Sequence, residues 1–436
     1  MEIDFPDRDR LAEASDTDRA NFPRFARARR ERAETRVEDV AGATRAALAS
    51  VDELEELPAG AEVAVTAGSR GIADVVAVLS AVADELRERD LAPFVLPAMG
   101  SHGGATADGQ VETLASLGIT PDAVGCEIRS SMAVTEVATD ADGRPVYAAE
   151  DALAADAVLL VNRVKPHTDY DGDYESGLCK MAVVGLGKHR GAEAMHNAAL
   201  ARGFQAVIPE RAGLLFEATP VVGGLALVEN VNERVAEVVG VPVDEILDRE
   251  PALLARSTER LATLPVDDLD LLVVDGMGKE VSGTGLDTNV IGRQQFHGQP
   301  EPDGPDVTRI YVRSLTPASH GNALGMGLAD FVHRDLVAAV DFGDTYLNVA
   351  TSGEPARARL PFVVPDDLTA FRLAASTTGV REPGALRVAA IENTLEPDDL
   401  LVSEPVATEL ADRPDVSVGD LEPLGFDDDG GVRLPW

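Results

Sequence analysis

The feature that most constrains the fold of this chain is a repeated order of short apolar runs, glycine-rich loops and longer helical patterns. Glu62–Ala67 is a β-rich run that leads into Gly68-Ser69-Arg70-Gly71 and a helical pattern over Ile72–Arg89. The order then repeats, with strands expected at 92–97 and 157–162, a loop at 99–104 and a helix at 106–117. Strands that alternate with helices in this way predict an α/β sheet with ligands at the carboxyl ends of the strands.

The C-terminal part of the chain predicts a second α/β domain. A boundary is expected near Leu264-Pro265, after which Leu269–Asp275 begins a new buried strand. Further strands are expected at 309–315 and 386–392, and a helix near 325–340. We therefore expect an N-terminal cofactor-binding domain over 1–265 and a C-terminal domain over 266–400, with the tail 401–436 packing back on the first.

The expected fold class is α/β, with an active-site cleft between the two α/β domains and the first domain Rossmann-like. Residues before Pro58 indicate charged helices, with a strongly basic stretch at 24–36 and an amphipathic one at 37–54. The first strand of the chain is therefore expected at Glu62.

The chain is strongly acidic, with a formal net charge of −38 from 76 acidic and 38 basic residues. Such a charge repels nucleic acid and anionic membranes, so we expect neither as a partner. The acidic residues are spread along a lysine-poor sequence. This suits a salt-rich cytosol, because at about 1 M salt charges are screened beyond roughly 3 Å. A hydrophobic fraction of 45% argues against disorder.

Cysteine content and the lack of long apolar runs indicate the compartment. Cys126 and Cys179 are too few for a disulfide framework or a four-cysteine metal site. The N-terminal residues are acidic, and no apolar run approaches the ~20 residues that cross a bilayer. We therefore expect a soluble, cytoplasmic protein that acts on a small molecule.

Amines and imidazoles are concentrated in one short segment of the chain. Of the four lysines, which stand against 34 arginines, three lie within 24 positions: Lys165, Lys180 and Lys188. The same segment holds three of the seven histidines: His167, His189 and His196. This concentration predicts that the chemistry takes place here.

Taken singly, residues of this segment also fit structural roles. His196 alone fits a hydrogen-bonded core histidine, and Lys180 alone fits a salt-bridge partner. Glycines at 185, 187 and 191 disfavour an unbroken helix from Lys180. We therefore expect a strand or loop and then a helix from about Gly191 that carries His196 inward. A lone imidazole holds a metal poorly, so a metal at His196 would need ligands from a cofactor.

Three other places offer groups that bind or react. His102 lies between an expected strand and a helix, a position that fits either a catalytic side chain or a turn cap. Ser69 and Arg70 offer a hydroxyl and a guanidinium to a phosphate at the start of the following helix. In the second domain, Lys279 and Arg293 flank a Gly/Ser/Thr-rich loop. They would meet a substrate carboxylate, unless the loop is an ordinary polar surface segment.

The order and spacing of these residues resemble the nickel-dependent lactate racemase family. Ser176 to Lys180 match that family's Ser-Gly-x-x-Lys, and His196 follows sixteen residues later, as the family's last histidine does. Pro166-His167 matches a Pro-His, and His102 followed by Thr106 matches a glycine-flanked histidine with threonine four positions on.

The resemblance implies an isomerase that racemises or epimerises 2-hydroxy acids with a nickel-pincer nucleotide, a pyridinium thioamide/thiocarboxylate mononucleotide that holds nickel. Lys180 would be its covalent anchor, a role that arginine cannot take, and His196 the nickel ligand. His102 and His167 would be the paired acid/bases, because an imidazole can take or give a proton at neutral pH. Ser69 and Arg70 would bind the nucleotide end.

Two departures from the family pattern predict a hydroxy acid other than lactate. The place of an acidic residue followed by Thr-Arg-Pro is taken by Ala67-Gly68-Ser69-Arg70-Gly71, and the segment between His167 and Lys180 is longer and more acidic. Two other functions remain open. One is a divalent-metal lyase or hydrolase that uses His167, His189 and His196 directly; the other is a non-catalytic nickel- or nucleotide-binding protein.

Overall fold

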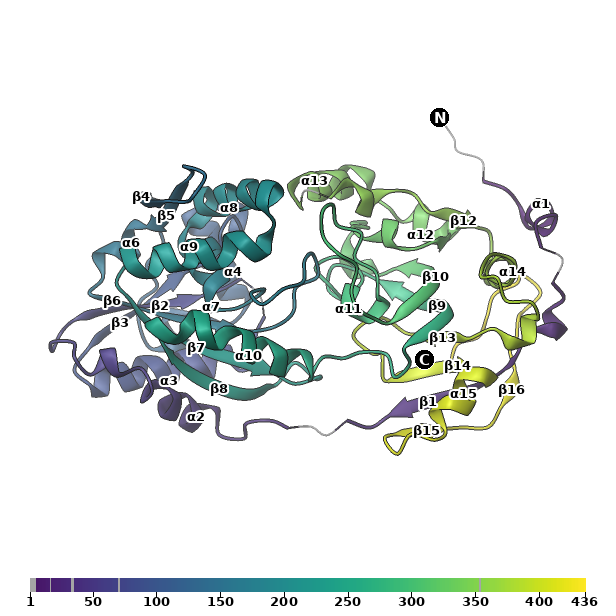
Figure 1. The fold of residues 1–436 in the computed structure, drawn as a ribbon, viewed down its shortest axis with the longest axis horizontal. Coiled ribbons are helices and arrows are strands. Elements are labelled where there is room, and N and C mark those ends of the chain that lie inside the picture. The colour runs from purple at the N-terminus through teal and green to yellow at the C-terminus, as the bar shows by residue number, and fades with distance from the viewer. Residues whose placement is uncertain (1–4, 16, 33–34, 70, 353) are drawn as a thin grey trace. The chain divides into compact units, whose positions relative to one another are not determined.

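The structure, a computed structural model, describes residues 5–15, 17–32, 35–69, 71–352 and 354–436. The chain forms two compact units: a continuous unit, Glu34–Leu261, and a split unit made of Met1–Ala33 and Ala262–Trp436. Each unit contains one main sheet with helices packed on it (Figure 1). The expected α/β class is confirmed.

The continuous unit is built on a five-stranded sheet in the order β3-β2-β6-β7-β8. The first four strands are parallel and β8 is antiparallel to β7. Numbered along the chain, this order is 2-1-3-4-5, which is the flavodoxin-like variant of the doubly wound fold and not the Rossmann order. The strands are β2 (Glu62–Ala67), β3 (Ala92–Pro97), β6 (Ala157–Arg163), β7 (Val221–Glu229) and β8 (Val235–Pro242).

Both faces of this sheet are covered by helices. Neighbouring strand residues point to opposite faces: a Cβ at Gly223 of β7 would meet Val51, whereas one at Gly224 would meet Leu178. One face therefore packs on α2 (Val40–Leu48), α3 (Val75–Glu88), α4 (Ala107–Ser116) and α5 (Pro121–Val124). The other packs on α7 (Leu178–Lys180) and α10 (Ile246–Thr258), while α9 (Phe204–Ala218) packs on α7 and α8 (Lys188–Arg202) packs on α9 (Figure 1).

A hairpin and one short helix complete the continuous unit. The hairpin consists of β4 (Val134–Thr139) and β5 (Pro145–Ala149), which form their own sheet and pack on α8 and α9. Helix α6 (Glu150–Ala154) then leads into β6.

The expected strands of this unit are confirmed. The runs expected at 62–67 and 92–97 are β2 and β3, and the run expected at 157–162 is β6 with one more residue. Their residues are buried almost throughout, because helices on both faces demand a continuous apolar run. The helix expected at 106–117 is α4, and the Thr106 hydroxyl caps it by accepting from Gly109 N–H at 3.1 Å.

The split unit is built on a nine-stranded sheet in the order β12-β11-β10-β9-β13-β14-β1-β15, with β16 also paired to β1. The five strands β12, β11, β10, β9 and β13 are parallel to one another. The pairs β13–β14, β14–β1 and β1–β15 are antiparallel. The strands are β1 (Arg24–Arg30), β9 (Asp268–Met277), β10 (Asp306–Leu315), β11 (Phe331–His333), β12 (Phe362–Val364), β13 (Val388–Ile391), β14 (Asp399–Ser403), β15 (Val416–Val418) and β16 (Glu422–Pro423). The helices are α1 (Arg8–Ala12), α11 (Thr288–Ile291), α12 (Arg334–Ala338), α13 (Phe342–Ser352), α14 (Asp367–Thr377) and α15 (Glu404–Leu410).

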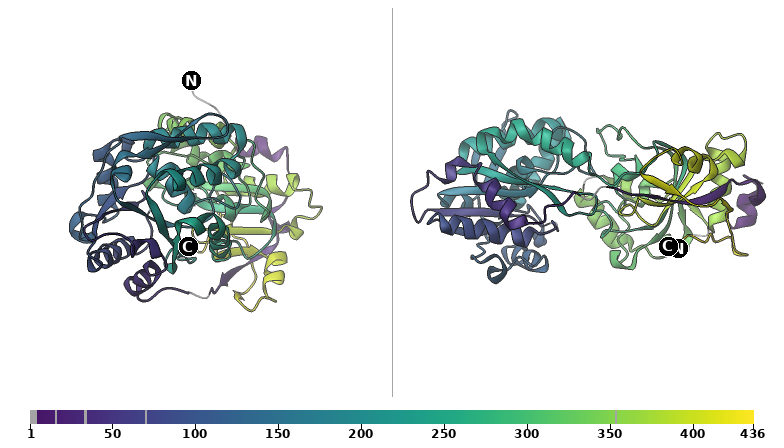
Figure 2. Two further views of the ribbon diagram at one scale, coloured as in Figure 1. Left: turned by 60° about the vertical axis from the view of Figure 1, so that its left-hand side comes forward. Right: turned by 90° about the horizontal axis from the view of Figure 1, so that it is seen from below.

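The expectations for the two ends of the chain are wrong. Residues 24–30, expected to be helical, form strand β1 between β14 and β15, where the first and last parts of the chain lie side by side (Figure 2). Strands β15 and β16 of the tail 401–436 pair with β1, so the tail belongs to the split unit. Pairing with acidic neighbours explains the basic strand: Arg27 meets Asp399 and Arg30 meets Asp398, each at 2.6 Å.

The expectation of a helix near 325–340 is also wrong in part. A 3-10 turn at Met326–Leu328 and helix α12 flank strand β11, which pairs with both β10 and β12. Long-range pairing on both sides therefore overrides the local helical pattern.

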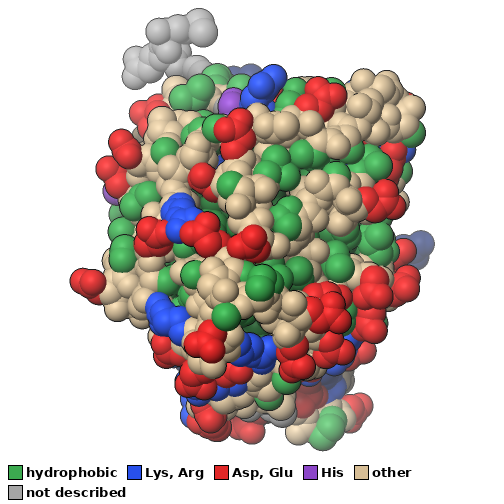
Figure 3. Space-filling view, turned by 90° about the vertical axis from the view of Figure 1, so that its left-hand side faces the viewer, with side chains coloured by type: hydrophobic (Ala, Val, Ile, Leu, Met, Phe, Trp, Pro, Cys, Tyr) green, Lys and Arg blue, Asp and Glu red, His purple; other side chains and the backbone are tan. Residues whose placement is uncertain are grey.

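Acidic side chains are spread across the face of the molecule drawn in Figure 3. Over the residues that the structure describes, no helix combines the length and the apolar character that a membrane crossing requires.

Candidate functional site

The candidate site lies at the carboxyl ends of three neighbouring strands of the continuous unit. Ser69 follows β2, the loop 98–104 follows β3, and the segment 164–180 follows β6. From the adjacent strands β2 and β6 the chain continues in opposite directions along the sheet, through α3 to β3 and through α7–α9 to β7. Doubly wound proteins bind ligands in the crevice at such a switch point.

The segment after β6 is a closed loop held by a buried carboxyl group. Lys165 and Ser176 exchange two backbone hydrogen bonds, at 2.9 and 3.2 Å. Inside the loop Glu175, 3% exposed, accepts from His167 N–H and Gly172 N–H. Burial raises the pKa of Glu175 to about 8, although these N–H groups favour its charged form. The loop thus fixes the backbone of His167.

Two aromatic rings bring three of the predicted residues together. Tyr170 stacks on His167 with ring centroids 4.6 Å apart, and on Phe204 at 4.2 Å. Two near-parallel rings at these distances cannot share one face of Tyr170, so they lie on opposite faces. His196 meets Phe204 edge-on at 6.2 Å. The Lys180 ammonium lies 5.2 Å from the Tyr170 centroid. Neither aromatic residue was singled out from the sequence; their scarcity, at 4% of the chain, was the available signal.

Lys180 and His196 lie on one helical segment with a break. The segment runs through α7, a π-helical turn at Met181–Leu186, and α8. The expected strand or loop before Gly191 is therefore wrong, and the break lies at Lys188, whose φ is +53°. π-Helical turns are frequent at functional sites.

His196 is exposed and does not point inward as expected. Its pKa is nevertheless held below 6.5, first because nearby protein removes water from the ring and then because of the Lys180 ammonium. Since the residue keeps an exposed surface, this desolvation is partial. Both effects favour the neutral imidazole, which is the form that binds metals.

The loop that carries His102 follows β3 and packs on the same helical segment. His102 Nδ1 shares a short hydrogen bond with the Ser69 hydroxyl, which joins the loops after β2 and β3. A Cβ at Gly100 would meet Val184 at 2.9 Å and Ala192 at 3.3 Å. These two lie one helical turn after Lys180 and one turn before His196, so the His102 loop packs on their segment. Arg70 lies outside the described residues.

A second buried carboxyl group lies at the start of the Lys180 helix. Glu250 of α10 is 1% exposed and accepts from Cys179 N–H at 3.0 Å. Gly177 has no side chain, and a Cβ there would overlap the Glu250 carboxyl group. Glu250 Oε1 makes no hydrogen bond to any part of the chain that the structure describes. Burial raises the pKa of Glu250 to about 7, against a usual value of 4.5.

We expect Glu250 to make the continuous unit less stable as pH rises. Its folded-state pKa lies above the unfolded one, so its contribution is complete below about pH 4.5 and is lost as pH rises through about 7. Relative to Glu250→Gln, the wild type should lose about 2 to 3 kcal/mol of unfolding free energy between pH 5 and 8. Denaturant titrations at constant salt measure this difference. Glu245→Gln, a change to an exposed carboxylate just before α10, should match the wild type; equal pH slopes for all three proteins would contradict the prediction.

The predicted substrate residues of the second domain lie in the split unit, after β9. Lys279 donates from Nζ to Gly283 O at 2.6 Å, and its N–H donates to Ser319 Oγ at 2.9 Å. Arg293 pairs with Asp330 at 2.7 Å and donates to backbone carbonyls, including that of Leu328. These contacts give Arg293 a structural role within its own unit. A substrate contact for either residue stays a prediction.

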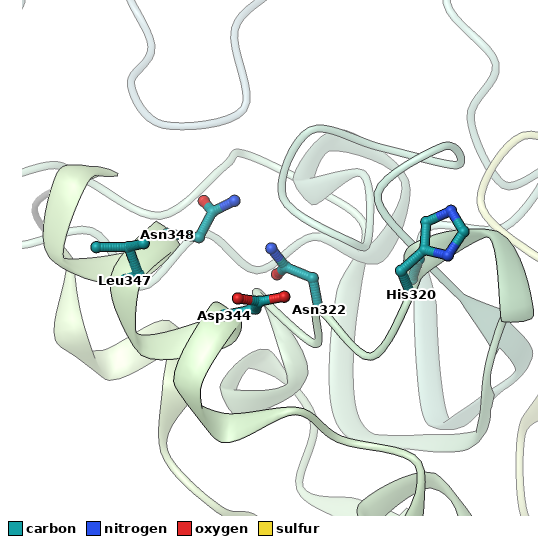
Figure 4. Close-up of a pocket in the computed structure, with 6 residues that line it drawn as sticks. His320, Asn322, Asp344, Leu347 and Asn348 are labelled. Carbon is teal, nitrogen blue, oxygen red and sulfur yellow. The ribbon is translucent and has the colours of Figure 1, made fainter. Parts of the chain in front are cut away.

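Ser319 also lines an open pocket of about 450 Å³ in the split unit. Figure 4 shows Asn322, Asp344 and Asn348 close together, with His320 set apart from them. Leu347 of α13 completes the lining. The pocket adjoins the Lys279 backbone through Ser319.

Comparison with known proteins gives little to set beside this geometry. No family model and no curated protein matches the chain. Among solved structures, the chain is similar to that of the lactate racemase apoprotein from Thermoanaerobacterium thermosaccharolyticum, at 12% sequence identity and a TM-score of 0.49. The match covers 84% of this chain and 95% of that one. Any functional conclusion therefore depends on the residues of this chain.

Proposed function

We propose that the chain is a racemase or epimerase of a 2-hydroxy acid other than lactate, which works with a lysine-tethered nickel-pincer nucleotide. One observation carries the proposal: Lys180, His167 and His196 converge on the Tyr170–Phe204 stack at the switch point of the sheet. The motif spacing of the sequence points to the same three residues.

The donor set fits the proposed cofactor. The described residues bring no three His, Cys, Asp or Glu side chains together as a protein-only metal site would need. The residues present offer an amine beside a neutral imidazole, and they fit a group that brings its own metal ligands. Lys180 would hold that group covalently and His196 would ligate its nickel. When bound, the group would accept hydrogen from the substrate carbon as hydride and return it to either face.

Each of the two proposed acid/bases has a hydrogen-bond partner at Nδ1. His167 Nδ1 accepts from Asp169 N–H at 3.1 Å, so the neutral ring carries its proton on Nε2 and donates there. His102 Nδ1 faces a hydroxyl that can donate or accept, so this ring can also take a proton at Nε2. In our proposal the neutral His102 ring takes the hydroxyl proton of one enantiomer at Nε2. When the other enantiomer forms, His167 acts as an imidazolium, with a proton on both ring nitrogens, and donates its Nε2 proton to the oxygen of the resulting 2-keto acid. The Asp169 carboxylate, 3.7 Å from His167 Nδ1, would stabilise that imidazolium.

The metal-lyase alternative requires a different arrangement. His167, His189 and His196 are all described, and they do not form a three-ligand group. His189 lies exposed at the start of α8. A lyase that uses these three imidazoles directly would have to rearrange them.

The test combines mass and turnover. The full chain is produced with nickel and the cofactor-making enzymes, and its intact and peptide masses are measured. We expect several hundred added daltons on a peptide that contains Lys180, and inversion of at least one acid in a panel of C2-deuterated 2-hydroxy acids. Absence of both results would refute the proposal, and added mass without inversion would favour the non-catalytic carrier.

We expect His102→Gln and His167→Gln to abolish inversion while the added mass stays on Lys180. General acid–base catalysis contributes about 10²- to 10⁴-fold, so each variant should lose at least about 10²-fold in kcat. Chiral chromatography of the product measures this loss. His333→Gln in the split unit is the matched control and should retain activity; full activity in both site variants would show that the assigned roles are wrong.

A further inference from the structure

Lys188 combines a left-handed backbone with a buried side chain. It is the first residue of α8, with φ at +53°, and is fully buried. Glycine adopts this conformation without strain, whereas lysine does not. Strained residues of this kind persist where the surrounding structure needs the side chain. The hydrogen bonds of the Lys188 amine show which parts of the chain this side chain holds together.

The Lys188 amine joins three parts of the candidate site. Nζ donates to Pro97 O, at the end of β3, at 2.5 Å, and to Gln110 Oε1 of α4 at 3.1 Å. Gln110 is also fully buried, and its Nε2 donates to Gly100 O at 3.0 Å and to His102 O at 3.5 Å. We call these four hydrogen bonds the Lys188 bridge. Burial lowers the pKa of Lys188 to about 8.

We propose that Lys188, acting through Gln110, is a positioning residue that holds the His102 loop against the helical segment carrying Lys180 and His196. Lys188 lies midway between them, eight residues after Lys180 and eight before His196. The His102 loop meets the same segment through Gly100, which packs on Val184 and Ala192. The catalytic meaning of the bridge rests on the proposed function; the bridge itself does not.

The chemistry of the bridge requires lysine. A carbonyl and an amide oxygen suit a compact ammonium with three donors, whereas arginine would bring five donors in a rigid plane. Each donor left without an acceptor in this buried place would destabilise the loop. The bridge therefore explains a second of the four lysines in a chain that otherwise uses arginine.

The test measures the loop itself in the full chain. The variants are Lys188→Met, Gln110→Leu and their combination. Hydrogen exchange of peptides covering 98–110 and the rate of His102 modification by diethyl pyrocarbonate are followed by mass spectrometry. We expect at least tenfold faster exchange, a several-fold change in the His102 rate, and a double variant no worse than the single ones. Modification of His333 is the internal reference.

Arg211→Met provides the control for a general loss of stability. Arg211 is buried in the same unit and pairs with Asp140, beyond β4. The Arg211→Met variant should have a lower melting temperature, with unchanged hydrogen exchange over residues 98–110. If Lys188→Met does not fold, Lys188→Gly, which suits the left-handed backbone, and Gln110→Leu decide the matter. Variants that change only the melting temperature, as Arg211→Met does, would overturn the proposal.

Turnover then separates this inference from the proposed function. In the loaded enzyme, Lys188→Met should lower kcat about 10²-fold, with KM nearly unchanged and the added mass still on Lys180. If no variant or wild type inverts any acid, the proposed function fails and the exchange result still judges the bridge. Loosened exchange with unchanged kcat would confine the bridge to stability and overturn its positioning role.

Discussion

Lys180→Arg should abolish inversion and leave the protein without added mass, whereas Lys165→Arg should retain both the inversion activity and the added mass. Arginine retains the positive charge that Lys180 places 5.2 Å from the Tyr170 ring centroid. It lacks the primary amine that a covalent link requires. Because enzymes accelerate reactions by about 10⁶-fold or more, losing the anchored group should take activity to background.

Two measurements check this prediction. Peptide mass mapping after loading locates the added mass, and chiral chromatography measures inversion. Lys165 is the matched control, because it is a primary amine in the same segment, and its backbone, which bonds to Ser176, is kept in the variant. Added mass on Lys180→Arg, or its transfer to Lys165, would show that Lys180 is not the anchor.

Arg211→Met should destabilise the continuous unit strongly, with a loss of about 3 to 5 kcal/mol in unfolding free energy. Arg211 of α9 bonds to Asp140 at 2.6 Å, and the two side chains are 1% and 0% exposed. Burial alone would raise the pKa of Asp140, but Arg211 and two backbone N–H groups outweigh it and hold the pKa below 3.8. Removing the guanidinium leaves that carboxylate buried and unpaired.

Calorimetry or denaturant unfolding at constant salt measures the loss. Arg202→Met is the control, because Arg202 of α8 pairs with Glu210 near the surface, and it should cost within about 1 kcal/mol. Asp140→Leu combined with Arg211→Met should recover most of the stability, since no charge is then buried alone. Equal effects of Arg211→Met and Arg202→Met would contradict the account.

The local pattern of apolar residues in the sequence predicted the strands that are surrounded by apolar side chains in the fold. Strands β2 and β3 lie where they were expected, because a strand covered on both faces needs a continuous apolar run whatever its partners are. Strand β1 could not be predicted in this way. Its sequence, RFARARR, becomes a strand only because β14 supplies Asp399 across the sheet and the preceding residue Asp398 pairs with Arg30.

The residues of the candidate site also fall into two groups, those that the sequence predicted and those that only the structure revealed. Motif spacing selected Lys180, His196, His167 and His102, since chemistry limits which side chains can serve as anchor, ligand or base. It did not reveal Tyr170 or Phe204, whose rings bring three of these residues together, or Glu175 and Glu250, whose burial sets their pKa values. Burial and stacking depend on groups distant in sequence, so spacing contains no sign of them.

The sequence by itself determined the α/β class, the inner strands and the short segment where reactive side chains gather. Tertiary structure alone decided the strand order, the pairing of the N-terminal and C-terminal strands in one sheet, and the contacts of Lys188. The physical reason is the range of the interactions. Hydrophobic periodicity is a property of neighbouring residues, whereas a buried amine is explained only by the carbonyl and amide oxygens, 91 and 78 residues away, that accept its hydrogen bonds.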